Sequence, residues 1–159
     1  MRKIITILIF LLISFLTQSQ QKKQDLKTYS FQEVEAKFLK NPKPILVFVY
    51  TDWCKICFGM KKTTFKNKNV ITTLNKNFYV VLLNGEEKKE ITFFGRKFTH
   101  KPSGLNVGNH ELAIEIGLVN GKVNYPTTVI LNKDLEINSQ FVGFINSKKM
   151  QLILENKNL

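Results

Sequence analysis

Two cysteines are the residues of this sequence whose type and spacing most directly suggest chemistry. Cys54 and Cys57 are the only cysteines of the chain, and both lie in the stretch TDWCKICFGM, residues 51–60. Thiols separated by two residues can form a structural disulfide, contribute ligands to a metal site, or cycle between dithiol and disulfide. The elements that position the pair help to decide among these uses.

The structural-disulfide and metal interpretations find little support in the sequence. A bond across so short a loop would remove only about 2 kcal/mol of chain entropy from the unfolded state. A zinc or copper site would need further ligands, and only His100 and His110 remain, more than 40 residues downstream. Because nothing in their spacing is specific for a metal, no metal ligand is assigned, and both interpretations stay open as alternatives.

The cysteines lie where an apolar segment gives way to an amphipathic one. Residues 45–50, ILVFVY, are apolar throughout, which predicts a strand buried on both faces. A helix is expected over residues 57–65, and a second buried strand over 78–83, FYVVLL. Two strands joined by a crossover helix run parallel in one sheet. The thiols are therefore expected at the junction between a strand and its crossover helix.

This junction favours the redox interpretation. Unpaired backbone N–H groups at a helix N-terminus stabilise a thiolate on Cys54, and Lys55 adds a positive charge. Cys57 follows by about one helical turn and can attack Cys54 in a mixed disulfide. Trp53, beside Cys54, is expected to form a wall of the partner-binding surface.

The flanking segments predict further helices and an antiparallel strand pair. Ser30 and Glu33 have the spacing of a capping box that starts a helix. Residues 127–131 and 137–144 are predicted to form a hairpin, after which Ser147 caps a last helix. The first helix is expected to turn Val34, Phe38 and Leu39 inward, and the last helix carries the apolar residues Met150, Leu152 and Ile153.

Residues 85–124 have the composition of an insertion in this α/β pattern. Residues 91–94 and 97–99 flank Gly-Arg and predict a hairpin, and residues 101–108 predict a loop. Asn109 is expected to cap a short helix that follows this loop. The sequence does not indicate whether this region recognises a partner or only covers the sheet.

The N-terminus has the pattern of an export signal. Two basic residues precede an apolar run over residues 4–16, and small polar residues follow it. This predicts a signal peptide over residues 1–19, with an uncleaved membrane anchor as the alternative. Residues 20–29 then form a linker or a first strand, and residues 30–159 form one domain. The expected location is extracytoplasmic or periplasmic.

The chain is strongly basic, with a formal net charge of +12. Removing the two basic residues of the predicted signal peptide leaves +12 − 2 = +10. The remaining chain has a single arginine, Arg96, and its lysines are scattered along the sequence. A nucleic-acid-binding surface normally clusters its basic residues, so no nucleic-acid partner is expected.

The segments that carry the cysteines resemble the thioredoxin superfamily. The strand ILVFVY, the motif WCKIC, the strand FYVVLL, and YPTTVIL followed by a hairpin and a helix occur in thioredoxin order over about residues 30–156. The likeness is to exported thioredoxin-like proteins and to the periplasmic thioredoxin-like domain of the transmembrane disulfide reductase. It implies the thioredoxin fold, an α/β fold whose central mixed sheet is flanked by helices.

The resemblance also implies a substrate-binding site and a reaction. Pro126 matches the family's cis-proline, which faces the active-site disulfide, and Tyr125 and Thr127 would flank the substrate groove. Exported proteins with disulfides or thiols would be the partners, an unidentified donor would supply electrons, and no cofactor is needed because the sulfurs carry both electrons.

Two departures from cytosolic thioredoxin leave the direction of electron flow open. Phe48 occupies the position of the family's buried acid, and Lys55-Ile56 replaces Gly-Pro between the cysteines. Asp52 is interpreted as a solvated turn residue. The favoured function is a thiol–disulfide oxidoreductase acting as a reductase. The alternatives are the same couple working as an oxidase, and a thioredoxin-fold copper chaperone.

Overall fold

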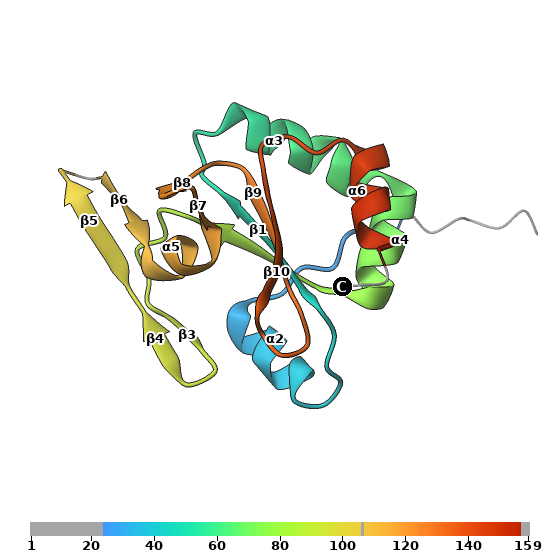
Figure 1. Ribbon diagram of the computed structural model, residues 1–159, viewed down its shortest axis with the longest axis horizontal. Helices are drawn as coiled ribbons and strands as arrows, with labels where there is room; N and C mark the ends of the chain where they lie inside the picture. Colours follow the sequence, from blue (N-terminus) through green and yellow to red (C-terminus); the bar gives the residue numbers. More distant parts are fainter. Residues whose placement is uncertain (1–23, 106, 157–159) are drawn as a thin grey trace, which may run out of the picture.

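The computed structural model describes residues 24–105 and 107–156, and at its centre is a four-stranded mixed sheet (Figure 1). The strands follow the order β10-β9-β1-β2, with β1 parallel to β2 and antiparallel to β9. Their bounds are β1 (Ile45–Tyr50), β2 (Tyr79–Asn84), β9 (Thr127–Leu131) and β10 (Ile137–Val142). The predicted α/β class, parallel pair and terminal hairpin are confirmed, although β10 ends at Val142 instead of at residue 144.

Helices cover both faces of this sheet (Figure 1). One face carries α2 (Phe31–Phe38) and α5 (Glu111–Gly117). The other face carries α3 (Lys55–Lys62), the 3-10 turn η1 (Thr64–Lys66), α4 (Lys68–Asn77) and α6 (Ser147–Leu154). The sheet therefore separates two hydrophobic clusters.

Strand β1 contributes side chains to both clusters. Ile45, Val47 and Val49 pack with α2 and α5, whereas Leu46 and Phe48 pack with α3, α4 and α6. All five side chains are fully buried. Since successive residues of a strand point to opposite faces, the uninterrupted apolar run is what a central strand between two helix layers requires, as the sequence predicted.

The helix starts agree with the predictions at one end of the domain and differ at the other. Ser30 Oγ accepts a hydrogen bond from the Glu33 N–H (3.3 Å), and a Glu33 carboxylate oxygen accepts one from the Ser30 N–H (2.7 Å), which confirms the capping box. Helix α6 is capped by Asn146, which accepts from the Lys149 N–H at 2.8 Å, so the prediction of a Ser147 cap was wrong by one residue. The prediction that Leu39 faces the core was wrong, since this C-cap of α2 is 72% exposed. The apolar Leu152 of α6 is also exposed, at 64%.

The segment that precedes α2 forms no strand over residues 24–30. It contacts the edge strand β2 through one backbone hydrogen bond, from the Tyr29 N–H to the Val80 carbonyl (2.9 Å). The predicted signal peptide, residues 1–19, lies outside the described residues. Among the helices within residues 24–105 and 107–156, none combines the length and apolar character needed to cross a membrane.

The inserted region consists mainly of short hairpins. The predicted hairpin is confirmed as β3 (Ile91–Phe93) and β4 (Arg96–Phe98). The predicted loop over residues 101–108 was wrong, because this segment pairs as β5 (His100–Gly104) and β6 (Val107–His110), which project away from the central sheet (Figure 1). The sequence predicted a loop over residues 101–108 because proline and glycine, both present there, are disfavoured in strands. An isolated two-stranded hairpin tolerates them, since its outer edges need no ladder partner.

Helix α5 begins one residue later than predicted. Its N-cap is His110, not Asn109, because the imidazole Nδ1 accepts the hydrogen bond from the Leu112 N–H (3.2 Å). After α5 the chain forms a last small hairpin, β7 (Leu118–Val119) and β8 (Lys122–Val123), and returns to the sheet at β9.

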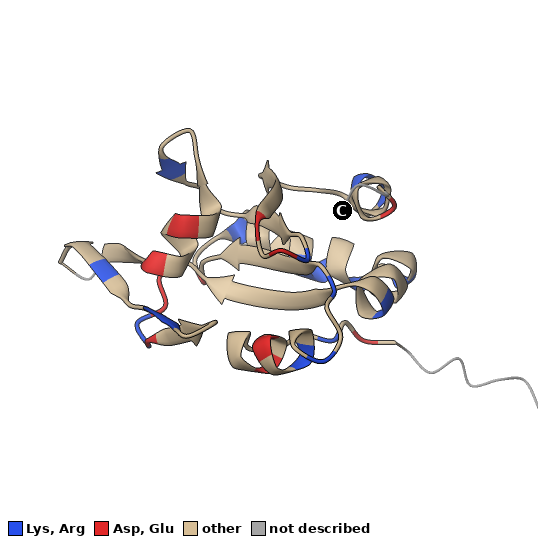
Figure 2. Cartoon of the chain, turned by 60° about the horizontal axis from the view of Figure 1, so that its bottom comes forward, with Lys and Arg blue, Asp and Glu red and all other residues tan. Residues whose placement is uncertain are grey.

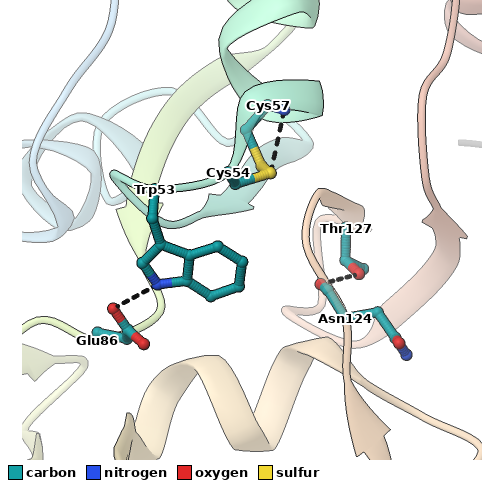
Figure 3. The surroundings of a disulfide bond; sticks show 6 residues. All are labelled: Trp53, Cys54, Cys57, Glu86, Asn124 and Thr127. Atoms are coloured by element: carbon teal, nitrogen blue, oxygen red, sulfur yellow. Dashed lines mark hydrogen bonds between the residues drawn. A yellow bond between two sulfur atoms is a disulfide. The ribbon is translucent and has the colours of Figure 1, made fainter. Parts of the chain in front are cut away.

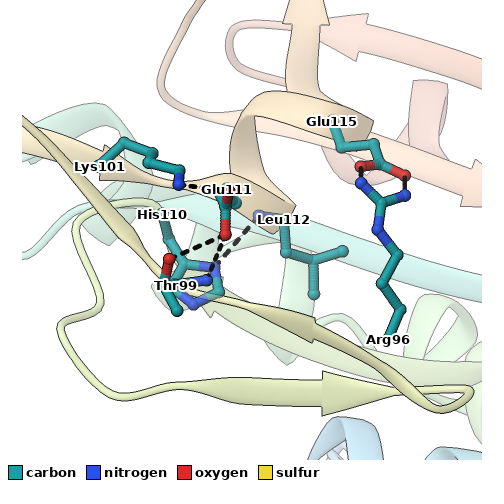
Figure 4. A network of polar contacts seen from close by, with 7 residues as sticks. All are labelled: Arg96, Thr99, Lys101, His110, Glu111, Leu112 and Glu115. Carbon is teal, nitrogen blue, oxygen red and sulfur yellow. Dashed lines mark hydrogen bonds and ion pairs between the residues drawn. The ribbon is translucent and has the colours of Figure 1, made fainter.

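Ion pairs attach two of the hairpins to α5 (Figure 4). Arg96 of β4 contacts the Glu115 carboxylate at 2.6 Å. Lys101 of β5 contacts Glu111 at 2.7 Å, and Glu111 also accepts hydrogen bonds from the Thr99 N–H (2.6 Å) and hydroxyl (2.9 Å). Lys101 first, and then the Thr99 donors, lower the pKa of Glu111 to about 2.

Charged residues otherwise lie on many different elements of the fold. Figure 2 shows lysine and arginine on helices, hairpins and loops without concentration on one element, and acidic residues lie among them. This arrangement agrees with the interpretation of the basic charge as a solvated surface.

The cap of α5 predicts a pH dependence of stability. His110 is fully buried, and burial lowers its pKa below 6.5, although the carboxylates of Glu87 and Glu111 act in the opposite direction. Below pH 6.5 the unfolded chain therefore binds a proton that the folded chain excludes, so we expect the free energy of unfolding to fall as the pH decreases from about 6.5.

Denaturant unfolding at pH 7.5, 6.5 and 5.5 measures this slope. His110→Asn keeps a capping side chain and should flatten the curve between pH 6.5 and 5.5. Glu111→Gln is the contrasting variant, since it leaves His110 in place and removes a carboxylate that raises the His110 pKa, so the slope between pH 6.5 and 5.5 should persist or steepen. The stabilisation due to the lowered pKa of Glu111 itself is lost only as the pH falls from about 4.5 towards 2. If the slope of the wild type persists in His110→Asn, the pH dependence of stability cannot be assigned to His110.

Candidate active site

The two cysteines form a disulfide at the N-terminus of α3 (Figure 3). Cys54 is the N-cap, and its Sγ accepts a hydrogen bond from the Cys57 N–H (3.1 Å). Cys54 is 7% exposed, whereas Cys57 is fully buried. Since an N–H group at a helix N-terminus points at the Cys54 sulfur, a negative charge on that atom would be stabilised. Cys54 is also the less buried of the two cysteines.

Trp53 lies beside the disulfide on the protein surface. Its side chain is 65% exposed, and the indole Nε1–H donates a hydrogen bond to the Glu86 carboxylate at 3.0 Å (Figure 3). Its ring meets the Tyr125 ring edge-on, with centroids 5.9 Å apart. Trp53 is thus an exposed residue next to Cys54, and its role as a wall of the partner-binding surface stays a prediction. Glu86 is an additional residue that the sequence did not single out.

The segment from Tyr125 to Thr127 leads into β9. The Tyr125–Pro126 peptide bond is cis, as the resemblance implied. The Gly143 N–H donates to the Pro126 carbonyl (2.8 Å). Thr127 is fully buried, and its hydroxyl donates to the Asn124 carbonyl (2.7 Å; Figure 3), so only its backbone can take part in a surface groove.

The inserted region contacts Tyr125 through Asn109 and Gly85. The Tyr125 hydroxyl donates a hydrogen bond to Asn109 Oδ1, and the ring packs directly on Gly85. Burial, with a smaller contribution from Glu86, raises the pKa of Tyr125 to about 12, so the phenol remains a neutral donor. The insertion thus fixes the residue that supports Trp53.

These supporting contacts have almost no signature in the sequence. Asn84-Gly85 at the end of β2 has the composition of a turn, but neither it nor Asn109 shows which distant residue it contacts. Tyr125 lies 40 residues after Gly85 and 16 after Asn109, and such long-range contacts depend on the tertiary fold and leave no local pattern.

Phe48 confirms that the interior beside the thiols is apolar. It is fully buried in the cluster that contains both cysteines. Its ring contacts Phe65 at 5.0 Å between centroids and stacks on Tyr50 at 6.2 Å. Asp52 is an exposed turn residue, as predicted from the sequence, and its carboxylate accepts a hydrogen bond from the Asn84 amide (3.1 Å).

Both histidines make contacts within the inserted region. His100 lies opposite His110 across the β5–β6 ladder, and its Nε2 is 3.0 Å from Lys88 Nζ. His110 caps α5 from a buried position. Within the part of the chain that the structure describes, no group of three or more His, Cys, Asp or Glu side chains is placed to hold a metal ion.

A family model described as a thioredoxin-like domain matches residues 31–158. A search of curated protein sequences gave no match.

Several solved structures share the fold at low sequence identity. A thioredoxin from Thermus thermophilus is 18% identical, with a TM-score of 0.57 over 82% of this chain and 85% of that chain. A DsbH oxidoreductase is 17% identical (TM-score 0.54; 81% and 84% covered). The oxidised C-terminal domain of DsbD from Neisseria meningitidis is 14% identical (TM-score 0.53; 81% and 97% covered). At these identities the likeness shows the fold alone.

Proposed function

This chain belongs to the thioredoxin-like family and is a thiol–disulfide oxidoreductase, and we propose that it acts as a reductase of exported proteins. The observation that supports this most is the Cys54–Cys57 disulfide at the start of α3, with one sulfur accessible and the other buried. The composition of residues 1–19 supports an extracytoplasmic location, because a basic start and an apolar run are typical of signal peptides.

In the proposed reaction the reduced protein transfers two electrons to its partner. The Cys54 thiolate attacks a partner disulfide, which forms a mixed disulfide and releases the first partner thiolate. Cys57 then loses its proton and attacks Cys54, which breaks the mixed disulfide and forms the Cys54–Cys57 bond. Two protons are taken up by the partner thiolates. Trp53 and the backbone around Pro126 would hold the partner chain during this exchange.

A trapping experiment tests the exchange. Cys57→Ser removes the attacking group of the second step, so we expect covalent adducts between Cys54 and partner proteins that reductant releases. The matched control is Cys54→Ser, which keeps one thiol but lacks the accessible one and should trap at least tenfold less. Equal trapping by the two variants, or none by either, would contradict the mechanism.

The reduction potential of the pair, measured in glutathione buffers, decides the direction. A value near that of thioredoxin, about −270 mV, would support the reductase. The helix N-terminus at Cys54 stabilises the thiolate and so favours the oxidase alternative, for which a value near about −120 mV is expected. If no disulfide forms at any potential, the copper-chaperone alternative gains support.

A further inference from the structure

The resolving cysteine is in an apolar environment, and no Asp or Glu side chain is buried in the part of the chain that the structure describes. Cys57 is fully buried in a cluster with Phe48, Met60 and Phe65, all of which are apolar. Burial in such surroundings disfavours a thiolate, yet the second step of the proposed exchange requires Cys57 to lose its proton. Some other group near this cluster must favour the charged form if the step is to be fast.

Lys61 is a cation of the active-site helix at the border of this cluster. It follows Cys57 by four residues in α3, and residues at this spacing lie on the same face of a helix. Its Nζ lies 3.0 Å from the centroid of the Tyr50 ring. The Tyr50 ring in turn stacks on Phe48 and packs against the cluster that contains both cysteines. The ammonium is thus held at the border of that cluster.

The charge of Lys61 is poorly compensated. Among the described residues, no carboxylate lies within ion-pair distance of Nζ. Burial lowers the pKa of Lys61, and the more distant Asp52 acts in the opposite direction. The pKa of Tyr50 is raised by burial first, and then by the carboxylates of Asp52 and Glu87. A partly buried cation without a close counter-ion acts over a longer distance than one in water.

We propose that Lys61 is a positioning residue that stabilises the thiolate form of the reduced Cys54–Cys57 pair. The inference rests on the proposed thiol–disulfide exchange. Lys61 touches neither the partner nor the reacting sulfurs. Its ammonium, fixed over Tyr50, favours the negative charge that appears when Cys57 loses its proton and persists until the sulfur bonds to Cys54.

Lys61→Met removes the charge and retains an apolar chain of similar length. Without the ammonium the reduced form is less stable, so the equilibrium constant with glutathione should shift about threefold to tenfold towards the disulfide form. A tenfold shift corresponds to a potential about 30 mV more negative. Alkylation of the reduced protein, followed for each cysteine by mass spectrometry, should require a higher pH than in the wild type.

Lys62→Met is the matched control, because Lys62 is the next residue of α3 and lies over the exposed Phe58 ring, 4.5 Å from its centroid. Lys62→Met makes the same change in net charge as Lys61→Met. It should leave the equilibrium constant with glutathione within twofold of the wild type and should not change the pH at which each cysteine is alkylated. Lys61→Arg keeps the charge and should restore both values, and it also provides a variant if Lys61→Met folds poorly.

Equal potentials and alkylation profiles for Lys61→Met and Lys62→Met would overturn the proposal. That result is distinguishable from a failure of the proposed function, which would be evident in the wild type as a pair that forms no disulfide or traps no partner. A loss of thermal stability without a change in potential would assign Lys61 a structural role and would also overturn the proposal.

Discussion

Replacing Phe48 by Asp is expected to lower the free energy of unfolding by roughly 5 kcal/mol or more, although it places an acid where thioredoxin has one. Truncation of a buried phenylalanine costs about 3–5 kcal/mol, and an unpaired carboxylate in an apolar cluster adds a desolvation cost. Phe48 is fully buried between Leu82 and Thr128 on the neighbouring strands, and its ring contacts Phe65. No cationic side chain is among these neighbours.

Urea unfolding measures this effect, and two companion variants separate its causes. Phe48→Leu keeps an apolar side chain and should cost about 1 kcal/mol. Phe48→Asn has nearly the shape of aspartate without its charge. Since burial would raise the pKa of the new carboxyl, the folded Asp variant would bind a proton more readily than the unfolded chain, and its deficit should shrink as the pH falls from 7 to 4.

A Phe48→Asp protein as stable as the wild type would show that the interior still accommodates an acid. The expected loss would instead show that the cluster around the thiols is built around an aromatic ring. In that case the proton of Cys57 must leave without a buried carboxylate, which is the situation in which the charge of Lys61 would matter most.

The segments that can be predicted from the sequence are those in which a local pattern decides the structure. The apolar run of β1 predicts a central strand because both of its faces must be covered, and the structure buries every residue from Ile45 to Val49. The position of Cys54 at a helix N-terminus follows from the adjacent strand and helix. The cis bond before Pro126 follows only from the family resemblance, since no local feature distinguishes it from a trans bond.

The remaining errors arise where tertiary contacts override local preference. Residues 101–108 contain a proline and two glycines, yet they pair as β5 and β6 because each segment finds the other as its partner. Leu39, at the C-cap of α2, was expected to face the core, but no layer of the fold covers it. The contact between Asn109 and Tyr125 joins the inserted region to the active-site segment, and no pattern in either segment indicates it.

Gly85→Ala tests whether this contact between the insertion and the site is as tight as the structure indicates. A Cβ at Gly85 would lie 2.6 Å from Tyr125 Cζ. The backbone at Gly85 cannot easily retreat, because its N–H donates to the Tyr50 carbonyl and its carbonyl accepts from the His110 N–H, both at 2.7 Å. The Tyr125 ring must therefore move and lose its hydrogen bond to Asn109. We expect a cost of about 1–3 kcal/mol.

Gly59→Ala is the matched control for Gly85→Ala, since Gly59 lies in α3 with no atom within 4 Å of the added methyl group. There the same substitution should stabilise the protein by about 0.5–1 kcal/mol, because alanine is the better helix former. Urea unfolding should therefore give a lower free energy of unfolding for Gly85→Ala and a higher one for Gly59→Ala, although the chemical change is the same. If Gly85→Ala were also neutral or stabilising, the packing of Tyr125 on Gly85 would be refuted.

The same substitution should also be visible at the active site. Trp53 is the only tryptophan of the chain, and its ring rests on Tyr125, so its fluorescence reports the displacement directly. In the double variant Gly85→Ala/Tyr125→Ala the clash is absent. Its loss in free energy of unfolding should therefore be smaller, by about 1 kcal/mol or more, than the sum of the losses measured for the two single variants. Such coupling would establish that the insertion determines where Tyr125 lies, and therefore what surface Trp53 presents beside Cys54. Additive costs would mean that the insertion covers the sheet without shaping the site.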